Sequence, residues 1–225
     1  MALKNKVNST IFDSINTEEK AYWLGFIYAD GNLSNKDKIF EKTKKSVYRI
    51  EVSLCSDDIS HLEKLRIFLG IEKELKLSKA SFRKERCRLY FNDKHMWNTL
   101  NSYGCTPVKS LTLKFPDIKI FKNENLIKDF IRGYIDGDGC ISYCDKDHNE
   151  MTLRILGTKN FLENLQKQLP LEKENKLSKK VNIYDLSFQR GRGLYVCNYL
   201  YKNAKIYLNR KYKRYKEYCR LYKEL

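Results

Sequence analysis

The pattern of hydrophobic and polar residues along the chain occurs twice, once in each half. Each half begins with an apolar helical segment and continues with short alternating strands and amphipathic helices. Residues 17–31, TEEKAYWLGFIYADG, start with a threonine suited to a helix N-cap and two glutamates suited to a first turn. The sequence therefore predicts a helix over residues 18–29.

The two apolar segments match each other residue by residue. When residues 23–31, WLGFIYADG, are set over residues 131–139, IRGYIDGDG, Gly25 aligns with Gly133 and Asp30 aligns with Asp138. The offset between the copies is close to half of the 225 residues. So dense a match at that offset indicates an internal repeat.

Similar elements follow each copy. Strict alternation in residues 47–55, VYRIEVSLC, predicts a strand, and residues 57–70, DDISHLEKLRIFLG, have helical spacing. Further strands and helices are expected over 74–92, 95–104, 151–157, 160–169, 180–190 and 193–203, before a basic last helix. The fold class is therefore α+β, with two αββαββα halves. The predicted domains are 1–116, a linker at 117–125 in a proline-containing stretch without periodicity, and 126–225.

Small residues lie four positions apart in both predicted helices. Gly25 and Ala29 share one helix face, and Gly133 and Gly137 occupy the matching places. Such spacing allows two helix backbones to approach closely. Two helices crossing on these faces would bring Asp30 and Asp138 together at their negative ends, which is unfavourable for bare carboxylates. A divalent cation with hard oxygen ligands, such as magnesium, would remove that penalty.

Composition adds a second constraint. Lys and Arg number 44 against 28 Asp and Glu, a formal net charge of +16, which favours a polyanionic partner. A 42% hydrophobic content suits a globular chain. No apolar run is long enough for a transmembrane helix, and the N-terminus lacks the apolar stretch of a signal peptide. An intracellular, cytoplasmic protein without a membrane partner is expected.

WLGFIYADG and IRGYIDGDG resemble the two motifs of the LAGLIDADG homing endonucleases in their single-chain form. Trp23, Leu24 and Arg132 depart from the consensus, and Tyr28 replaces the first acid, whereas the second acid is intact in both copies. The resemblance implies pseudo-symmetric halves with antiparallel saddle-shaped sheets over DNA and motif helices at the central interface. It also implies a monomer that makes a magnesium-dependent double-strand break in a long DNA site, as in intron homing.

The resemblance also implies residue roles. The catalytic residues would be Asp30, Asp138, Lys109 and Lys211, with Arg210 the close rival of Lys211. The metal site would comprise Asp30, Asp138, Gly31 and Gly139, sharing two or more magnesium ions, with Asp136 at the helix end in support. Polar strand faces would contact DNA through the following residues: Arg49, Glu51, Ser53, Arg83, Arg86, Arg88, Arg154, Asp185, Ser187 and Gln189. Arg210, in the basic last helix, would contact DNA as well.

Other functions need fewer of these features. An RNA maturase, or a DNA-binding regulator on the same scaffold, would need the basic faces but not both aspartates, and a maturase would add RNA as a partner. A membrane-surface binding module would fit the charge, but it explains neither the repeat nor the paired acids.

Overall fold

The computed structural model describes residues 7–40, 43–80, 83–143 and 150–222. The chain divides into two compact units. The first comprises Met1–Ser14 and Asp30–Val108, and the second comprises Ile15–Ala29 and Lys109–Leu225. The first predicted motif helix therefore belongs, up to Ala29, to the same compact unit as the second. The domain boundaries drawn from the sequence stay a prediction.

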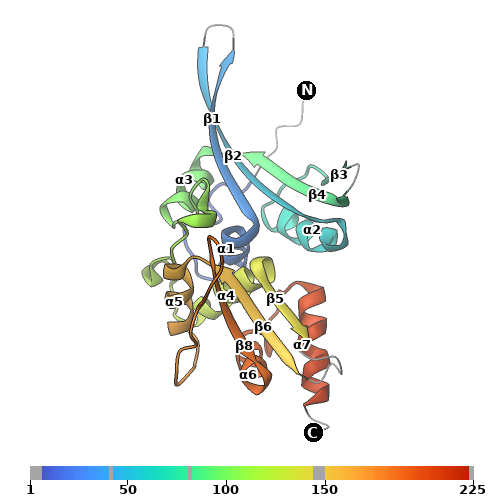
Figure 1. The fold of residues 1–225 in the computed structure, drawn as a ribbon. Coiled ribbons are helices and arrows are strands. Elements are labelled where there is room, and N and C mark those ends of the chain that lie inside the picture. The colour runs from blue at the N-terminus through green and yellow to red at the C-terminus, as the bar shows by residue number, and fades with distance from the viewer. Residues whose placement is uncertain (1–6, 41–42, 81–82, 144–149, 223–225) are drawn as a thin grey trace. The chain divides into compact units, whose positions relative to one another are not determined.

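The first unit is an antiparallel sheet with strand order β1-β2-β4-β3, against which two helices pack (Figure 1). In chain order its elements are β1 (Gly31–Phe40), β2 (Thr43–Cys55), η1 (Ser56–Asp58), α2 (Ile59–Phe68), β3 (Lys76–Ala80), β4 (Arg83–Asn92) and α3 (Lys94–Ser102). Ile50, Val52 and Leu54 of β2 are buried, as the alternation predicts. They share the core with Leu65 of α2 and Leu100 of α3.

The second unit has the same sheet topology, in the order β5-β6-β8-β7. Its elements are α1 (Glu18–Asp30), η2 (Lys109–Leu111), η3 (Ile118–Ile120), α4 (Asn125–Asp138), β5 (Gly139–Tyr143), β6 (Met151–Gly157), α5 (Lys159–Lys167), β7 (Ser178–Lys179), β8 (Tyr184–Gln189), α6 (Arg190–Tyr201) and α7 (Asn209–Leu221). Helices α5 and α6 pack on β6 and β8, and α7 packs along the edge strand β5 (Figure 1). The predicted α+β class with two four-stranded antiparallel sheets is confirmed.

Local sequence explains where the motif helices begin and end. The Thr17 hydroxyl accepts a hydrogen bond from the backbone N–H of Lys20 (3.3 Å), which confirms the predicted N-cap of α1. At the other end, strands follow without an intervening loop: Gly31 begins β1 and Gly139 begins β5. The acidic ends of the helices therefore lie at the beginnings of the strands.

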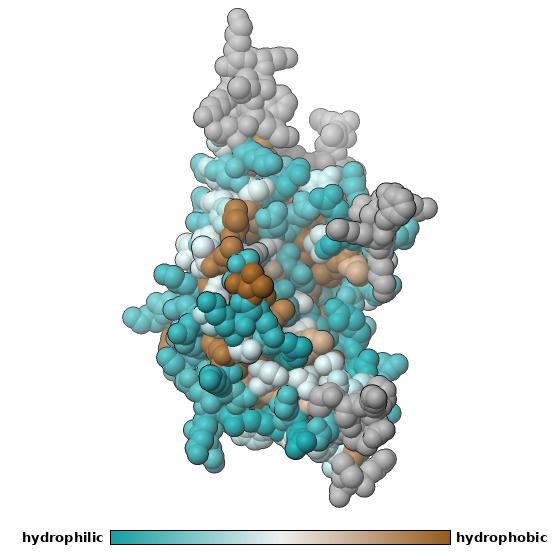
Figure 2. Space-filling model, viewed as in Figure 1, coloured by the Kyte–Doolittle hydropathy of each residue, from teal (hydrophilic) through white to brown (hydrophobic). Residues whose placement is uncertain are grey.

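Hydrophilic residues predominate on the face of the molecule drawn in Figure 2. Exposed large apolar side chains occur at separate places along the chain, among them Ile67, Leu111 and Val181. Scattered exposure of this kind is ordinary for a globular protein. Within the described residues, no helix is both long and apolar enough to cross a membrane.

Candidate active site

Helices α1 and α4 meet through their glycines. A Cβ atom added to Gly25 would overlap the carbonyl oxygen of Phe130 and lie 2.8 Å from that carbonyl carbon. A Cβ atom added to Gly133 would meet the Tyr22 carbonyl in the same way, 2.9 Å from its carbon. The two backbones are thus in direct contact at matched positions of the repeat. The close helix contact predicted from the glycine spacing is confirmed.

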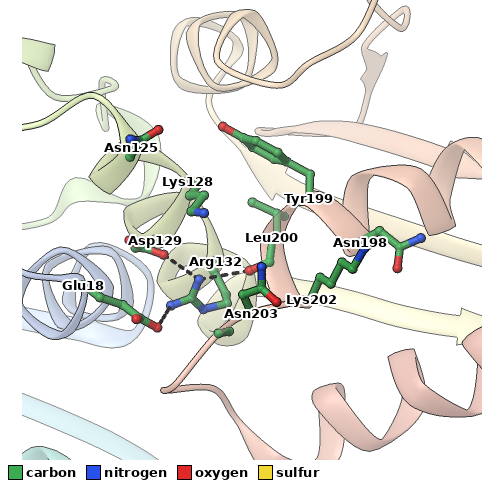
Figure 3. A pocket seen from close by; sticks show the side chains of 11 residues that line it. Glu18, Asn125, Lys128, Asp129, Arg132, Asn198, Tyr199, Leu200, Lys202 and Asn203 are labelled. Carbon is green, nitrogen blue, oxygen red and sulfur yellow. Dashed lines mark hydrogen bonds and ion pairs between the residues drawn. The ribbon is translucent and has the colours of Figure 1, made fainter.

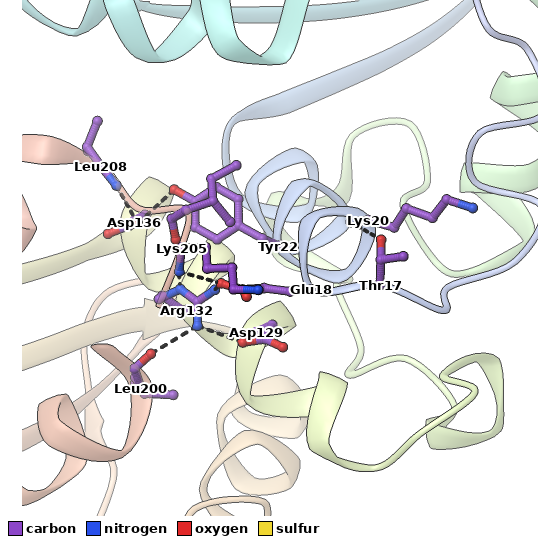
Figure 4. A network of polar contacts seen from close by, with 11 residues as sticks. Thr17, Glu18, Lys20, Tyr22, Asp129, Arg132, Asp136, Leu200, Lys205 and Leu208 are labelled. Carbon is purple, nitrogen blue, oxygen red and sulfur yellow. Dashed lines mark hydrogen bonds and ion pairs between the residues drawn. The ribbon is translucent and has the colours of Figure 1, made fainter. Parts of the chain in front are cut away.

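Asp136 forms a buried polar junction beside this contact (Figure 4). Its carboxylate accepts hydrogen bonds from the hydroxyls of Tyr22 and Tyr201, each at 2.7 Å, and from the backbone N–H of Leu208 at 2.8 Å. Burial raises the pKa of Asp136, while the charge of Lys211 and these three donors act in the opposite direction. Asp136 therefore ties α1, α6 and the segment before α7 to α4.

Tyr28 of the first motif occupies the position that corresponds to Asp136 in the second motif. Its side chain is fully buried among aromatic rings. Its ring centroid lies 5.0 Å from that of Phe130, in an edge-to-face arrangement, and 6.5 Å from that of Phe161. The first acid position of the repeat therefore has a polar junction in one copy and an aromatic cluster in the other.

Lys211 lies at the C-terminal end of α4. Its side chain is buried, and its Nζ donates hydrogen bonds to the carbonyl oxygens of Ile135 (2.6 Å), Asp136 (2.7 Å) and Gly137 (3.3 Å). The last carbonyls of a helix have no partner within the helix and carry its partial negative charge. Lys211 satisfies these carbonyls and offsets that charge beside Asp138.

Lys109 makes the corresponding contact at the end of α1. Its Nζ donates a hydrogen bond to the carbonyl oxygen of Ala29 at 2.9 Å. The preceding residue, Val108, has a φ of 56°, a conformation that is costly for a β-branched residue. A pocket of about 200 Å³ is lined by Lys109 and Asp138 together with Tyr28, Ala29 and Tyr134. The structure thus brings Lys109 close to the acid of the second motif.

Asp138 ends α4 with a solvent-exposed side chain. Protein atoms around the carboxyl group raise the pKa of Asp138, while the positive charges of Lys109 and Lys211 lower it in part. The next residue, Gly139, has no room for a side chain, because an added Cβ atom would lie 2.8 Å from the Cγ2 of Ile135. A glycine at position 139 therefore allows β5 to start at the residue that follows Asp138.

Asp30 ends α1 as Asp138 ends α4, and its side chain is half-buried. Asp30 and the buried Gly31 belong to the first unit, whereas Asp138 and Gly139 belong to the second. Among the described residues, no group of three or more His, Cys, Asp or Glu side chains could hold a metal ion.

Arg132, a departure from the motif consensus, lies in the middle of α4 and is almost fully buried (Figure 3). Its guanidinium donates to Glu18 (2.8 Å) and Asp129 (2.7 Å), and to the carbonyl oxygens of Leu200 and Ile206, both at 3.0 Å. Burial raises the pKa of Asp129, and Arg132 counteracts part of that rise. The group forms one wall of a polar pocket of about 400 Å³.

Glu18 extends this network to the segment that leads into α7 (Figure 4). Its Oε1 accepts the backbone N–H of Lys205 at 2.7 Å in addition to the Arg132 guanidinium. We expect Glu18→Gln to lower the free energy of unfolding by about 1–2 kcal/mol, because the hydrogen bond loses its charge assistance. Thermal unfolding would measure this as a fall in Tm of roughly 3–6 °C.

Glu19→Gln is the matched control for this prediction. Glu19 is exposed and lies in the same first turn, so both variants lose the same favourable interaction with the helix dipole. A shift within a few tenths of a kcal/mol is expected for Glu19→Gln. Equal shifts in the two variants would show that the contacts of Glu18 with Arg132 and Lys205 contribute nothing.

One face of the first sheet is polar and carries five of the eleven residues predicted to contact DNA. Arg49, Glu51 and Ser53 of β2 alternate with the buried positions. Cross-strand pairs join them to β4: Arg88 donates to Glu51 (3.0 and 2.5 Å), and Arg86 donates to the hydroxyl of Ser53 (3.1 Å). The arginines are thus held on the polar face. Arg83 is the first residue of β4, and its side chain is not among those that the structure describes.

The second sheet has a similar polar face. Register pairs Arg154 of β6 with Ser187 of β8, and Thr152 with Gln189. Arg154 remains half-exposed and is ion-paired with Asp185, whose side chain is 4% exposed. Asp185 therefore holds Arg154 in place and presents little surface of its own. Arg210, the remaining residue predicted to contact DNA, is exposed in the first turn of α7.

Sequence reasoning missed the roles of Arg132 and its partners. An arginine within an apolar helical run, three residues after Asp129, was the available signal, because residues three apart face each other on a helix. The contacts of Glu18 and Leu200 with Arg132 had no such signal. They join residues 114 and 68 positions apart in sequence.

The chain matches no model of a known protein family, and no curated protein matches it in sequence. Solved structures match its fold. The I-LtrWI LAGLIDADG homing endonuclease bound to target DNA has a TM-score of 0.62 at 13% identity, covering 96% of this chain and 91% of that one. Meganuclease I-SmaMI bound to uncleaveable DNA has a TM-score of 0.58 at 14% identity, covering 88% of each chain.

A further similar structure is the LAGLIDADG homing endonuclease I-GzeII in complex with its DNA target, with a TM-score of 0.57. It is 14% identical over 89% of this chain and 88% of that one. The likeness shows that this chain has the two-sheet fold of the LAGLIDADG homing endonucleases. The fold agrees with the one implied by the two sequence motifs.

Proposed function

We propose that this protein is a site-specific DNA endonuclease that uses magnesium to make a double-strand break in a long recognition site. The observation that carries the proposal is the construction of the two motif helix ends. Each helix ends in an aspartate, and each has a lysine bound near that end: Lys109 on the Ala29 carbonyl of α1, and Lys211 on three carbonyls of α4. The solved relatives were bound to DNA targets, and I-SmaMI was also solved on uncleaved DNA in the presence of calcium ions.

The residues present fit a hard divalent cation. Asp138 offers an exposed carboxylate at a helix end, and Asp30 is its counterpart in the repeat. Each carboxylate would hold a metal ion at its own helix end, and a bound ion would activate water and stabilise the charge on a phosphodiester. A few carboxylates with room for water and phosphate are the usual magnesium environment.

The other residues would bind and orient the substrate. Arginines on the polar sheet faces, including Arg88 and Arg154, are held by acidic partners and so are pre-oriented for base edges or phosphates. Lys109 lies on the pocket that contains Asp138, where its ammonium group would donate hydrogen bonds to a phosphate oxygen. Lys211, buried on the α4 carbonyls, would keep that helix end neutral enough to receive the phosphate.

Selection of cleaved molecules from a randomised duplex library, with magnesium present, tests this proposal. We expect one long, nearly non-palindromic site to be enriched, with both strands cut, and no cutting when the metal is chelated. Binding without cutting under every metal condition would indicate that the protein is a DNA-binding regulator. Preferential binding of structured RNA over any duplex would leave an RNA maturase. Either outcome overturns the endonuclease proposal.

A further inference from the structure

Helix α7 presents an almost entirely cationic face to solvent. Its exposed positions are Asn209, Arg210, Lys213, Lys216 and Arg220. We call the four cations Arg210, Lys213, Lys216 and Arg220 the α7 basic face. Their spacing of three or four residues places them along one side of the helix. Arg210 is among the residues predicted to contact DNA, whereas Lys213, Lys216 and Arg220 lie outside that predicted set.

Apart from Arg220, which lies in the last turn at the negative end of the helix dipole, this arrangement does not stabilise the helix. Like charges three and four residues apart repel one another, and cations in a first turn face the positive end of the helix dipole. The acidic residue of α7, Glu217, is engaged by Arg214 (3.8 Å) and by the hydroxyl of Tyr143 (3.2 Å). Within the described part of the chain, no acidic side chain pairs with Lys213, Lys216 or Arg220. A polyanionic partner would offset this repulsion.

The opposite side of α7 fixes the helix firmly to the second unit. Tyr218 donates to the carbonyl oxygens of Ser142 and Glu150, both at 3.1 Å, at the β5 edge of the sheet. Tyr215 donates to the Asn198 side chain of α6 at 2.9 Å. The same helix also delivers Lys211 to the end of α4. The α7 basic face therefore starts within one helical turn of the candidate active site and continues along β5.

We propose that the α7 basic face binds the sugar-phosphate backbone of the substrate duplex next to the cleavage site. This inference rests on the proposed endonuclease function. From Arg210 to Arg220 the helix advances about 15 Å, at roughly 1.5 Å per residue. One strand of a duplex presents a phosphate about every 3.4 Å along its axis, so this length corresponds to about four phosphates for four cations. Flexible lysines and arginines that neutralise phosphates add affinity without reading sequence.

The test compares the salt dependence of binding to the selected site for wild-type protein and a triple variant, Lys213→Gln, Lys216→Gln and Arg220→Gln. Each lost phosphate contact lowers the slope of log affinity against log salt concentration by about 0.9, so the triple variant should lose roughly 2–3 units of slope. The loss should be the same for specific and random duplexes. All three side chains are exposed, so the Tm is expected to stay close to that of the wild type.

A second triple variant controls for net charge. Lys122→Gln, Lys167→Gln and Lys173→Gln removes three exposed cations of the same unit that lie away from α7, and its slope should match the wild type. An unchanged slope in the α7 variant, or an equal fall in both variants, overturns the inference. Loss of binding to anionic vesicles with duplex binding unchanged also overturns it, because the partner would then be a lipid surface. If the wild-type protein cleaves no duplex, the proposed endonuclease function is wrong, and this result does not depend on the binding slopes of the variants.

Discussion

Asp138→Asn is expected to lower the rate of double-strand cleavage by about 10³-fold or more while duplex binding is retained. The amide keeps the shape of the side chain but removes the charge that holds the metal, and metal-based stabilisation amounts to several kcal/mol of the barrier. Asp138 lies beyond the polar sheet faces, at the end of α4, so binding energy from the strands is preserved. Asp30→Asn is expected to act in the same way from the end of α1.

The measurement is single-turnover cleavage of the selected site, with binding followed separately by titration. Asp117→Asn removes the same charge from an exposed position before η3, and it should cleave at the wild-type rate. Wild-type cleavage by either Asp138→Asn or Asp30→Asn would remove these aspartates from the proposed metal site. Loss of binding in parallel with cleavage would instead place them in the DNA contact surface.

Gly133→Ala is expected to destabilise the protein by about 3 kcal/mol or more, which corresponds to a fall in Tm of roughly 10 °C. An ordinary alanine substitution inside a helix is stabilising, because it removes the backbone entropy of glycine. Here the added methyl group would overlap the Tyr22 carbonyl, and main-chain atoms cannot move aside as a flexible side chain can. Gly25→Ala meets the Phe130 carbonyl and should cost a similar amount.

Gly191→Ala is the matched control for the contact between α1 and α4. Gly191 lies inside α6, and an added Cβ atom would meet nothing within 4 Å. This variant should therefore show a Tm equal to or slightly above that of the wild type. An unchanged Tm for Gly133→Ala would mean that α1 and α4 are not in backbone contact.

The helix contact and the polar sheet faces could be predicted from the sequence because both depend on local periodicity. Gly25 and Gly133 stand out as costly residues in otherwise good helices, so their spacing required a physical reason. The alternation of Arg49, Glu51 and Ser53 with apolar residues required one buried and one free face. Neither deduction needed knowledge of distant partners.

The polar networks could not be predicted in this way because they depend on residues far apart in sequence. Asp136 was expected to be a supporting residue at the helix end. Its three donors come from Tyr22, Tyr201 and the segment before α7, and nothing local indicates that they converge. Strand β1 was also missed, because residues 31–40, GNLSNKDKIF, show no clean alternation. This segment forms a strand because it pairs with β2, and not because of any alternation in its own sequence.

The placement of α1 affects the order in which the chain can fold during synthesis. Residues 15–29 belong to the compact unit that is completed only by residues 109–225, and the strands of the first unit lie between them in sequence. Eight consecutive residues of α1, from Ala21 to Tyr28, are buried in the finished protein. At roughly 5–20 residues per second, α1 leaves the ribosome about 5–20 s before α4. For that interval α1 lacks the helix whose backbone it contacts in the finished protein, although the strands of the first unit are synthesised in the meantime.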